Sequence, residues 1–172
     1  MPTTRGGEDP DRRSGPRWTA GTARRTTTLR AVAPLPARVR AFVESGPLAH
    51  CVTINRDGSP QVSAVWVALD GDDLLMAHLR ESAKVRNLRR DPRVALSFES
   101  PERNAVGMQH NLVLHGTAEV TEGGAPELLQ RMARVYVGPD AVFPGMPDPP
   151  PGFVARIRVD RVGGAGPWHD PE

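Results

Sequence analysis

The sequence predicts a mainly β fold with short helices attached, an antiparallel barrel of six strands. Six short segments are rich in β-branched and apolar residues, and turn signals at Asp57-Gly58 and Asp70-Gly71 join the first three. Only three segments, all short, place apolar residues at helical spacing. No internal repeat is visible, and a chain of 172 residues is long enough for one domain with a real core.

A short helix is expected to open the fold near Leu35, because Val39, Phe42 and Val43 recur at helical spacing before Gly46. β-Branched residues then predict three strands, over 48–55, 61–69 and 74–79.

The second of these strands has two unlike faces. Alternation places Val62, Ala64 and Trp66 on one face, and Gln61, Ser63 and Val65 on the other. Two polar residues on an otherwise apolar strand require hydrogen-bond partners. Trp66 is expected to belong to the core or to a dimer interface rather than to stack on a ligand.

The second half of the chain is predicted to hold helices at 83–90 and 127–135 and strands at 93–99, 111–120 and 153–160. The first of these helices should end at Asp91-Pro92, because proline disfavours helical geometry in the residue before it. A loop rich in Pro and Gly, 138–152, precedes the last strand, and its Phe143–Pro147 segment suits either a substrate lid or a plain connection.

Composition divides the chain into three parts. Residues 1–33 carry many arginines and almost no apolar periodicity, and we expect a disordered tail. Residues 34–162 contain all the predicted strands and helices and are expected to form one folded domain. Residues 163–172 are expected to form a glycine-rich C-terminal tail, in which Trp168 can tuck against a surface.

The bulk composition excludes several classes of protein. With 22 basic and 20 acidic side chains the formal net charge is only +2, which gives no general case for nucleic-acid binding. No apolar run approaches the roughly 20 residues of a membrane helix. The single cysteine, Cys51, cannot form an internal disulfide, and we expect a cytoplasmic protein.

The predicted helix 83–90 carries a candidate phosphate site. Lys84, the only lysine of the chain, falls in its first turn, where a cation opposes the helix dipole unless an anion lies beside it. Ser82 stands at the cap position, Arg80 is near, and Asn87 follows one helical turn after Lys84. Free N–H groups at a helix start bind phosphate readily. The same residues would also suit an ordinary basic surface helix.

Several motifs, in order along the chain, resemble one family. They are Asp57–Ser63, Val65-Trp66, Ser82–Val94, Gly116–Val120, and Arg156–Arg158 followed by Arg161-Val162. Together they resemble the flavin reductases of the pyridoxamine-phosphate-oxidase superfamily, over residues 35 to 162. The segment Asn87–Arg93 is most similar to the branch that uses the deazaflavin coenzyme F420. Two features depart from the family: His78-Leu79 replaces small hydroxyl-bearing residues, and 101–109 has no clear counterpart.

The resemblance implies an FMN-binding type of split β-barrel and a homodimer with two cofactors at the subunit interface. It implies that Lys84 binds the cofactor phosphate, assisted by Arg80, Ser82 and Asn87. It further implies that Ala77 and His78 pass close to the cofactor ring and ribityl chain, and that Gln61 and Ser63 face the same site. Gln109 of the partner subunit is expected to contribute as well.

The activity implied is hydride transfer between F420 and a small unsaturated substrate. An FMN-dependent oxidase or reductase, or a split barrel that binds a flavin or another ligand without catalysis, remain alternatives. No catalytic side chain is expected, because such a cofactor carries the reaction itself; His78 is a candidate proton donor.

A protein metal site is not expected. His50 and Cys51 are adjacent on a strand and point to opposite faces, and His110 and His115 diverge for the same reason. Cys51 is expected to be a small buried residue rather than a reactive thiol, and Tyr136 to serve packing.

Overall fold

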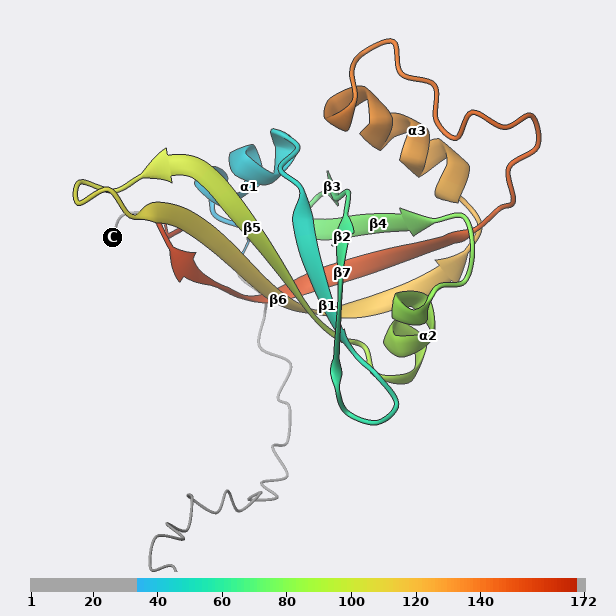
Figure 1. Cartoon of the computed structure of the whole chain (residues 1–172), viewed down its shortest axis with the longest axis horizontal. Helices are drawn as coiled ribbons and strands as arrows, with labels where there is room; N and C mark the ends of the chain where they lie inside the picture. The colour runs from blue at the N-terminus through green and yellow to red at the C-terminus, as the bar shows by residue number, and fades with distance from the viewer. Residues whose placement is uncertain (1–33, 170–172) are drawn as a thin grey trace, which may run out of the picture. The chain divides into compact units, whose positions relative to one another are not determined.

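A computed structural model describes residues 34–169, and in this part of the chain one antiparallel sheet of seven strands is flanked by three helices (Figure 1). The elements are α1 (Ala37–Glu44), β1 (Ala49–Ile54), β2 (Pro60–Val65), β3 (Ala68–Asp70), β4 (Asp73–His78), α2 (Ala83–Arg90), β5 (Arg93–Arg103), β6 (Gln109–Glu122), α3 (Ala125–Tyr136) and β7 (Phe153–Ala165). The strand order is β2-β1-β5-β6-β7-β4-β3. The predicted mainly β, antiparallel fold is therefore confirmed. The tail predicted for residues 1–33 lies outside the described residues.

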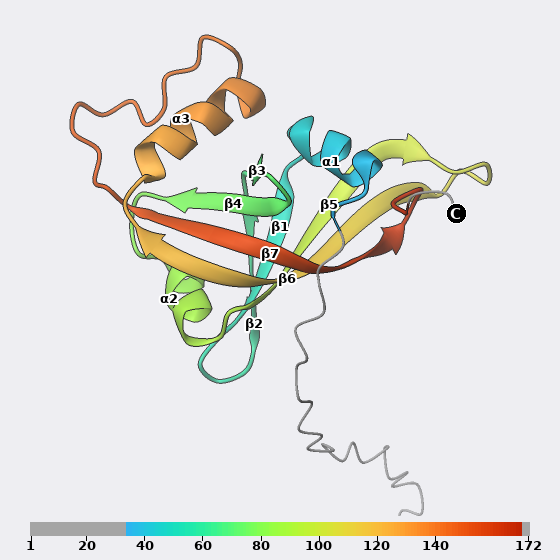
Figure 2. The same ribbon diagram turned by 180° about the vertical axis from the view of Figure 1, so that it is seen from behind.

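The sheet buries side chains on two sides. The main cluster fills the concave side and includes the fully buried Phe98, Leu112 and Ile157. A smaller cluster lies between β4 and α3, which covers that strand on the other side (Figure 2). Both faces of β4 are consequently buried, with Met76 in the main cluster and Leu75 under α3.

The strand predicted over 61–69 is in fact two strands on opposite edges of the sheet. β2 pairs with β1, and β3 pairs with β4. Only Trp66 and Val67 connect them, a distance of roughly 10 Å at full extension. The two edges must therefore lie close together, and the sheet closes into a barrel that is split at this point.

Tyr136 explains why the strand breaks there. Its hydroxyl accepts a hydrogen bond from the N–H of Val67 at 2.9 Å and lies 3.0 Å from the oxygen of Val67 and 3.2 Å from that of Pro47. These bonds replace the strand pairing at Val67. Trp66 stacks on Tyr136 with ring centroids 5.3 Å apart, so it belongs to the packing under α3.

The C-terminal boundary predicted at residue 162 is wrong. β7 continues to Ala165, and Trp168 is only 4% exposed, with its indole N–H donating to the oxygen of Asn111 at 2.7 Å. Gly164, one of the glycines that suggested a tail, is needed for strand packing, because a Cβ there would collide with that same oxygen. β5 and β6 are likewise longer than predicted and form one hairpin that includes residues 101–109.

In the part of the chain that the structure describes, no helix is long and apolar enough to cross a membrane.

Gly116→Ala should destabilise the fold by about 2 kcal/mol, the usual cost of overpacking. A Cβ at residue 116 would collide with the backbone oxygen of Arg158 and lie 2.8 Å from Cγ2 of Ile157. Gly163→Ala, in the neighbouring strand β7, is the matched control, because its nearest atom would be 3.8 Å away. Urea unfolding measures both, and equal unfolding midpoints would contradict the close approach of β6 and β7.

Candidate functional site

Lys84 is a half-buried cation in the first turn of α2. It forms no ion pair with any of residues 34–169, and burial lowers the pKa of its ammonium group. The first turn of α2 contains no acidic residue. Because the positive end of the helix dipole lies here, Lys84 and the dipole repel each other, and an anion would relieve both.

Three predicted site residues carry buried polar atoms that lack a hydrogen-bond partner in the described structure: Ser63 Oγ, His78 Nε2 and Ser82 Oγ. Ser82 stands at the N-cap of α2 as predicted, but the capping bond expected of its side chain is not made. Buried polar groups are almost always paired in folded proteins. Their occurrence at three of the predicted positions indicates a place for a polar ligand.

The charge of Lys84 affects the pKa of residues on two strands, His78 of β4 and Cys51 of β1. The pKa of His78 is lowered to about 4, first by burial and then by the charge of Lys84, so its imidazole is neutral at pH 7. Burial raises the pKa of Cys51 to about 11, and Lys84 opposes that shift. Cys51 lies opposite Ser63 in the β1–β2 pair, so their side chains share a face of the sheet. The predicted burial of Cys51 is confirmed.

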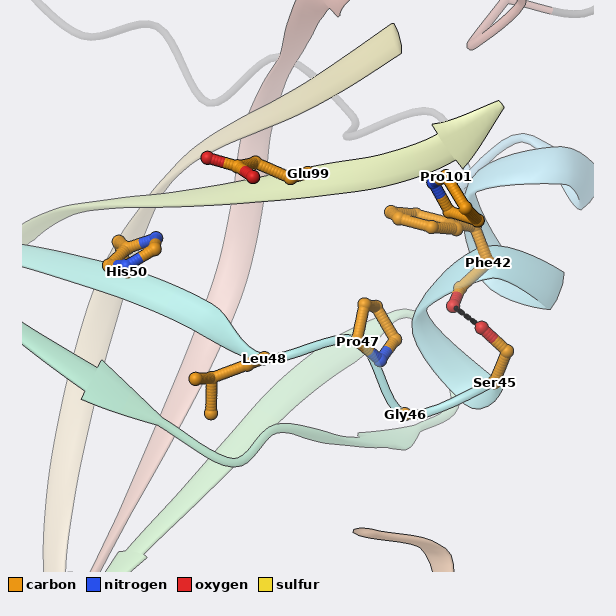
Figure 3. A pocket seen from close by; sticks show the side chains of 8 residues that line it. All are labelled: Phe42, Ser45, Gly46, Pro47, Leu48, His50, Glu99 and Pro101. Carbon is orange, nitrogen blue, oxygen red and sulfur yellow. Dashed lines mark hydrogen bonds between the residues drawn. The ribbon is translucent and has the colours of Figure 1, made fainter. Parts of the chain in front are cut away.

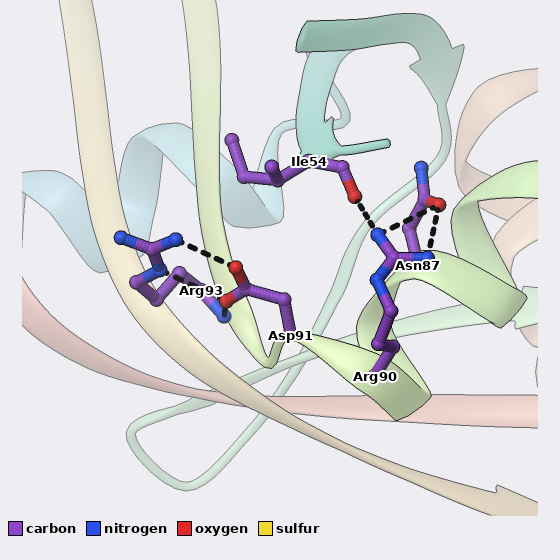
Figure 4. Close-up of polar contacts among 5 residues, drawn as sticks. All are labelled: Ile54, Asn87, Arg90, Asp91 and Arg93. Atoms are coloured by element: carbon purple, nitrogen blue, oxygen red, sulfur yellow. Dashed lines mark hydrogen bonds and ion pairs between the residues drawn. The ribbon is translucent and has the colours of Figure 1, made fainter. Parts of the chain in front are cut away.

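A hydrogen-bonded network fixes α2 against β1. Asn87, only 4% exposed, donates its amide protons to Thr53 Oγ1 at 3.1 Å and to Asn55 Oδ1 at 2.9 Å. Arg90 donates to Asn87 Oδ1 at 3.3 Å and to the backbone oxygen of Ile54 (Figure 4). Both amide protons of Asn87 are thereby occupied. The residue positions the helix, and its predicted contact with a cofactor would require breaking this network.

Just beyond the helix, Asp91 and Arg93 form a two-bond ion pair, with Nε and Nη2 of Arg93 at 2.9 and 2.6 Å from the two carboxylate oxygens (Figure 4). The Arg93 guanidinium holds the pKa of the Asp91 carboxyl down at about 2. This pair fixes the turn from α2 into β5 at Pro92.

The network extends to Gln61. Thr53 Oγ1 donates to Gln61 Oε1 at 2.8 Å, and the Gln61 amide donates to the oxygen of Val62 at 3.1 Å. Gln61 and Ser63 are half-buried while Val62 and Ala64 are exposed, so the polar pair faces inward. Sequence reasoning missed Thr53 and Asn55 as members of this network. Their polar side chains, at the end of a strand whose other residues are largely apolar, were a signal that they have hydrogen-bond partners.

The side chains of two predicted site residues, Ala77 and Arg80, make no polar contact with the other predicted site residues. Neighbouring residues in a strand point to opposite faces, and Ala77 packs under α3 while His78 points the other way. Arg80 is exposed and forms no hydrogen bond or ion pair with residues 34–169. The network and the electrostatics relate Gln61, Ser63, His78, Ser82 and Lys84 to one region, and the predicted cofactor contacts of Ala77 and Arg80 stay predictions.

An open pocket of about 420 Å³ lies elsewhere, where α1 leads into the start of β1 (Figure 3). Its lining is Phe42, Ser45, Gly46, Pro47, Leu48, His50, Glu99 and Pro101. None of the predicted site residues belongs to it. Among residues 34–169, no three His, Cys, Asp or Glu side chains come together as metal ligands.

His78→Gln should flatten the dependence of stability on pH. The pKa of His78 falls from 6.5 to about 4 on folding, so the unfolded chain binds more protons between these values. The unfolding free energy of the wild type therefore decreases as pH falls through this window, by at most about 1.4 kcal/mol per pH unit. Urea unfolding from neutral pH to about pH 4.5 tests this. Equal slopes for the two proteins would show that His78 protonates freely in the fold.

Known proteins share this architecture. Among solved structures, an F420 reductase is 26% identical, with 72% of this chain and 94% of that chain covered and a TM-score of 0.61. The conserved hypothetical protein Rv2991 from Mycobacterium tuberculosis is 28% identical, with 80% and 89% covered and a TM-score of 0.59. HupZ of Group A Streptococcus, 18% identical with 80% and 100% covered and a TM-score of 0.56, shares the fold alone.

No curated protein matches the sequence. The family model for pyridoxamine 5'-phosphate oxidase, in contrast, matches residues 35–165, which is the whole sheet with its three helices. With most of its length matched in this way, the chain belongs to the pyridoxamine 5'-phosphate oxidase family of split β-barrels.

Proposed function

We propose that this protein is an oxidoreductase that binds a phosphorylated flavin-type cofactor at the start of α2, with F420 as the preferred cofactor and FMN as the alternative. The observation that carries the proposal is the half-buried Lys84, which has no counter-ion among residues 34–169 and adjoins buried polar atoms without partners. Family membership supports the flavin chemistry. The 26% identity with an F420 reductase supports the choice of F420.

The residues present fit a cofactor phosphate. Lys84 supplies a positive charge, Ser82 Oγ is unbonded, and no side chain caps the first turn of α2. The first N–H groups of a helix have no partner within the helix and point outward along its axis. A phosphate here would accept charge-assisted hydrogen bonds from all three sources. Arg80, exposed nearby, would assist by adding to the positive field.

A second group of residues fits the uncharged part of the cofactor. His78 is neutral at pH 7 and Ser63 carries a hydroxyl, so both offer hydrogen bonds without charge. Such groups suit the hydroxyls of a ribityl chain, which both F420 and FMN possess. Lys84 and Ser82 then hold the charged end while Ser63 and His78 orient the polyol.

When bound, the cofactor would supply hydride transfer, and we propose a small unsaturated compound as the substrate. The chain's own part is to hold the cofactor, to orient it and to limit water around it. The buried environment that makes His78 neutral would serve that last purpose. FMN remains the alternative because it offers the same ribityl phosphate to Lys84, and it would direct the activity toward oxidase or reductase chemistry.

Lys84→Gln should weaken binding of F420 and FMN at least about tenfold, the effect of a lost charge-assisted contact with phosphate. Arg86→Gln is the matched control. It removes one positive charge from the same helix, but Arg86 is exposed and donates only to the oxygen of Glu81. Fluorescence titration of each purified variant gives the dissociation constants.

The two variants separate a specific phosphate contact from a general positive field. Equal weakening in both would mean that only the overall charge of α2 matters. Unchanged affinity in Lys84→Gln would overturn the assignment of the phosphate site. Wild-type protein that binds neither cofactor would overturn the proposed function itself.

A further inference from the structure

Arg89, in the last turn of α2, contacts three other parts of the chain. Its Nη1 donates to Glu81 Oε1 at 3.0 Å, and its Nη2 donates to Glu122 Oε1 at 2.7 Å. Its guanidinium carbon also lies 4.8 Å from the ring centroid of Phe153. Glu122 ends β6 and Phe153 begins β7, so Arg89 fixes the end of α2 to the part of the sheet that lies beside it (Figures 1 and 2).

Glu81, one of the two acidic partners, lies at the start of the same helix. It precedes the N-cap residue Ser82 by one position and Lys84 by three. A carboxylate in this place is attracted by the positive end of the helix dipole and by the ammonium group of Lys84. The same two groups are offered to a ligand by the proposed phosphate site. Glu81 is therefore an internal anion that can compete with a phosphate.

The structure shows Glu81 turned to Arg89 instead. Its carboxylate bonds to that guanidinium, eight residues further along the chain, and Lys84 forms no ion pair with any of residues 34–169. Ser82 Oγ, next to Glu81 in sequence, is likewise without a hydrogen-bond partner among the described residues. The acidic side chain beside the helix start is thus paired with a cation at the helix end, and the first turn is left open.

The backbone that carries Glu81 is fixed by other contacts. Arg86 Nη1 donates to the backbone oxygen of Glu81 at 3.4 Å. A Cβ at Gly152, the residue before β7, would lie only 3.0 Å from Cα of Leu79, so the link between β4 and α2 passes close along the chain there. Because the backbone is held in this way, what can change is the direction of the Glu81 side chain.

We propose that Arg89 is a positioning residue of the phosphate site, which holds the carboxylate of Glu81 away from Lys84 and so leaves the site open for a phosphate. Without Arg89, the carboxylate would turn toward Lys84 and the free N–H groups of the first turn. It would then compete with the ligand for both. Arg89 acts through Glu81 and does not touch the ligand itself, and this role rests on the proposed function of the site.

Paired substitutions separate this role from a purely structural one. Arg89→Gln should weaken binding of F420 and of FMN about fivefold, the effect of a competing ion pair at a partly exposed site. Arg89→Gln combined with Glu81→Gln should bind nearly as tightly as the wild type, because the competing carboxylate is gone. Fluorescence titration of the full chain gives the dissociation constants. Damage to the fold by Arg89→Gln would not be repaired by removing a second residue.

Arg89→Gln combined with Glu122→Gln is the matched control. Glu122 is the other acidic partner of Arg89, so this double variant has the same net charge as the one that lacks Glu81. It leaves the carboxylate of Glu81 in place, and its binding should stay as weak as that of Arg89→Gln alone. The comparison of the two double variants therefore excludes a general effect of charge.

A second measurement needs no cofactor. Lys84 is the only lysine of the chain, so lysine labelled with ¹³C at Cε gives a single NMR signal that reports the pKa of its ammonium group. Arg89→Gln should raise the pKa of Lys84, because a carboxylate beside it favours the charged form, and the added Glu81→Gln should lower it again. Cys51 and His78, the other titratable groups that interact with Lys84, are present in every variant.

The two measurements distinguish failure of this proposal from failure of the proposed function. The proposal on Arg89 is overturned if the double variant without Glu81 binds no more tightly than the control without Glu122. It is equally overturned if the pKa of Lys84 is the same in Arg89→Gln and in the wild type. If the wild type binds neither cofactor, the proposed function fails, and the titration of Lys84 still decides whether Arg89 restrains Glu81.

Discussion

The closeness of the two sheet edges is the constraint on which both the fold and the candidate site depend. β2 and β3 are at opposite ends of the strand order, yet Trp66 and Val67 alone connect them. Tyr136 secures this crossing with hydrogen bonds to Val67 and a stacked contact with Trp66. β2 pairs with β1 at one edge of the sheet, and β3 pairs with β4 at the other. Closure of the sheet therefore brings Ser63 of β2 and His78 of β4 into the same part of the barrel.

The position of α2 against the strands is set by the buried side-chain amide of Asn87. Asn87 ties the helix to Thr53 and Asn55, and Thr53 in turn holds Gln61. The helix is thereby presented with its N-terminus and Lys84 toward the barrel. Leaving Ser63, His78 and Ser82 unpaired costs roughly 1–3 kcal/mol for each buried group. That unfavourable arrangement is understandable where a ligand completes the hydrogen bonds.

Sequence reasoning reached the elements that local patterns determine. The bounds predicted for α2, 83–90, agree with the structure, since Ser82 and Pro92 limit the helix from either side. It failed where contacts between residues far apart in the sequence determine the structure. The break at Val67 depends on Tyr136, 69 residues away, and the role of Asn87 depends on Thr53, 34 residues away. No local pattern encodes such partners.

The same distinction applies to the candidate site and to the chain end. Lys84 was recognisable because a lone lysine at a helix start is unfavourable by itself. For Ala77 the family resemblance gives a position along the strand, whereas the packing of α3 decides which way the side chain points. Gly163 and Gly164 suggested a tail, although close strand packing is what requires Gly164.

The most direct test of the account is an NMR titration of the wild-type protein with FMN and with F420. Binding at α2 predicts the largest shifts at the amides of Ala83, Lys84 and Val85 and at the imidazole of His78, with the deazaflavin the tighter ligand. Shifts confined to the pocket around His50 and Leu48, with α2 unaffected, would contradict the assignment of Lys84 as the phosphate-binding residue.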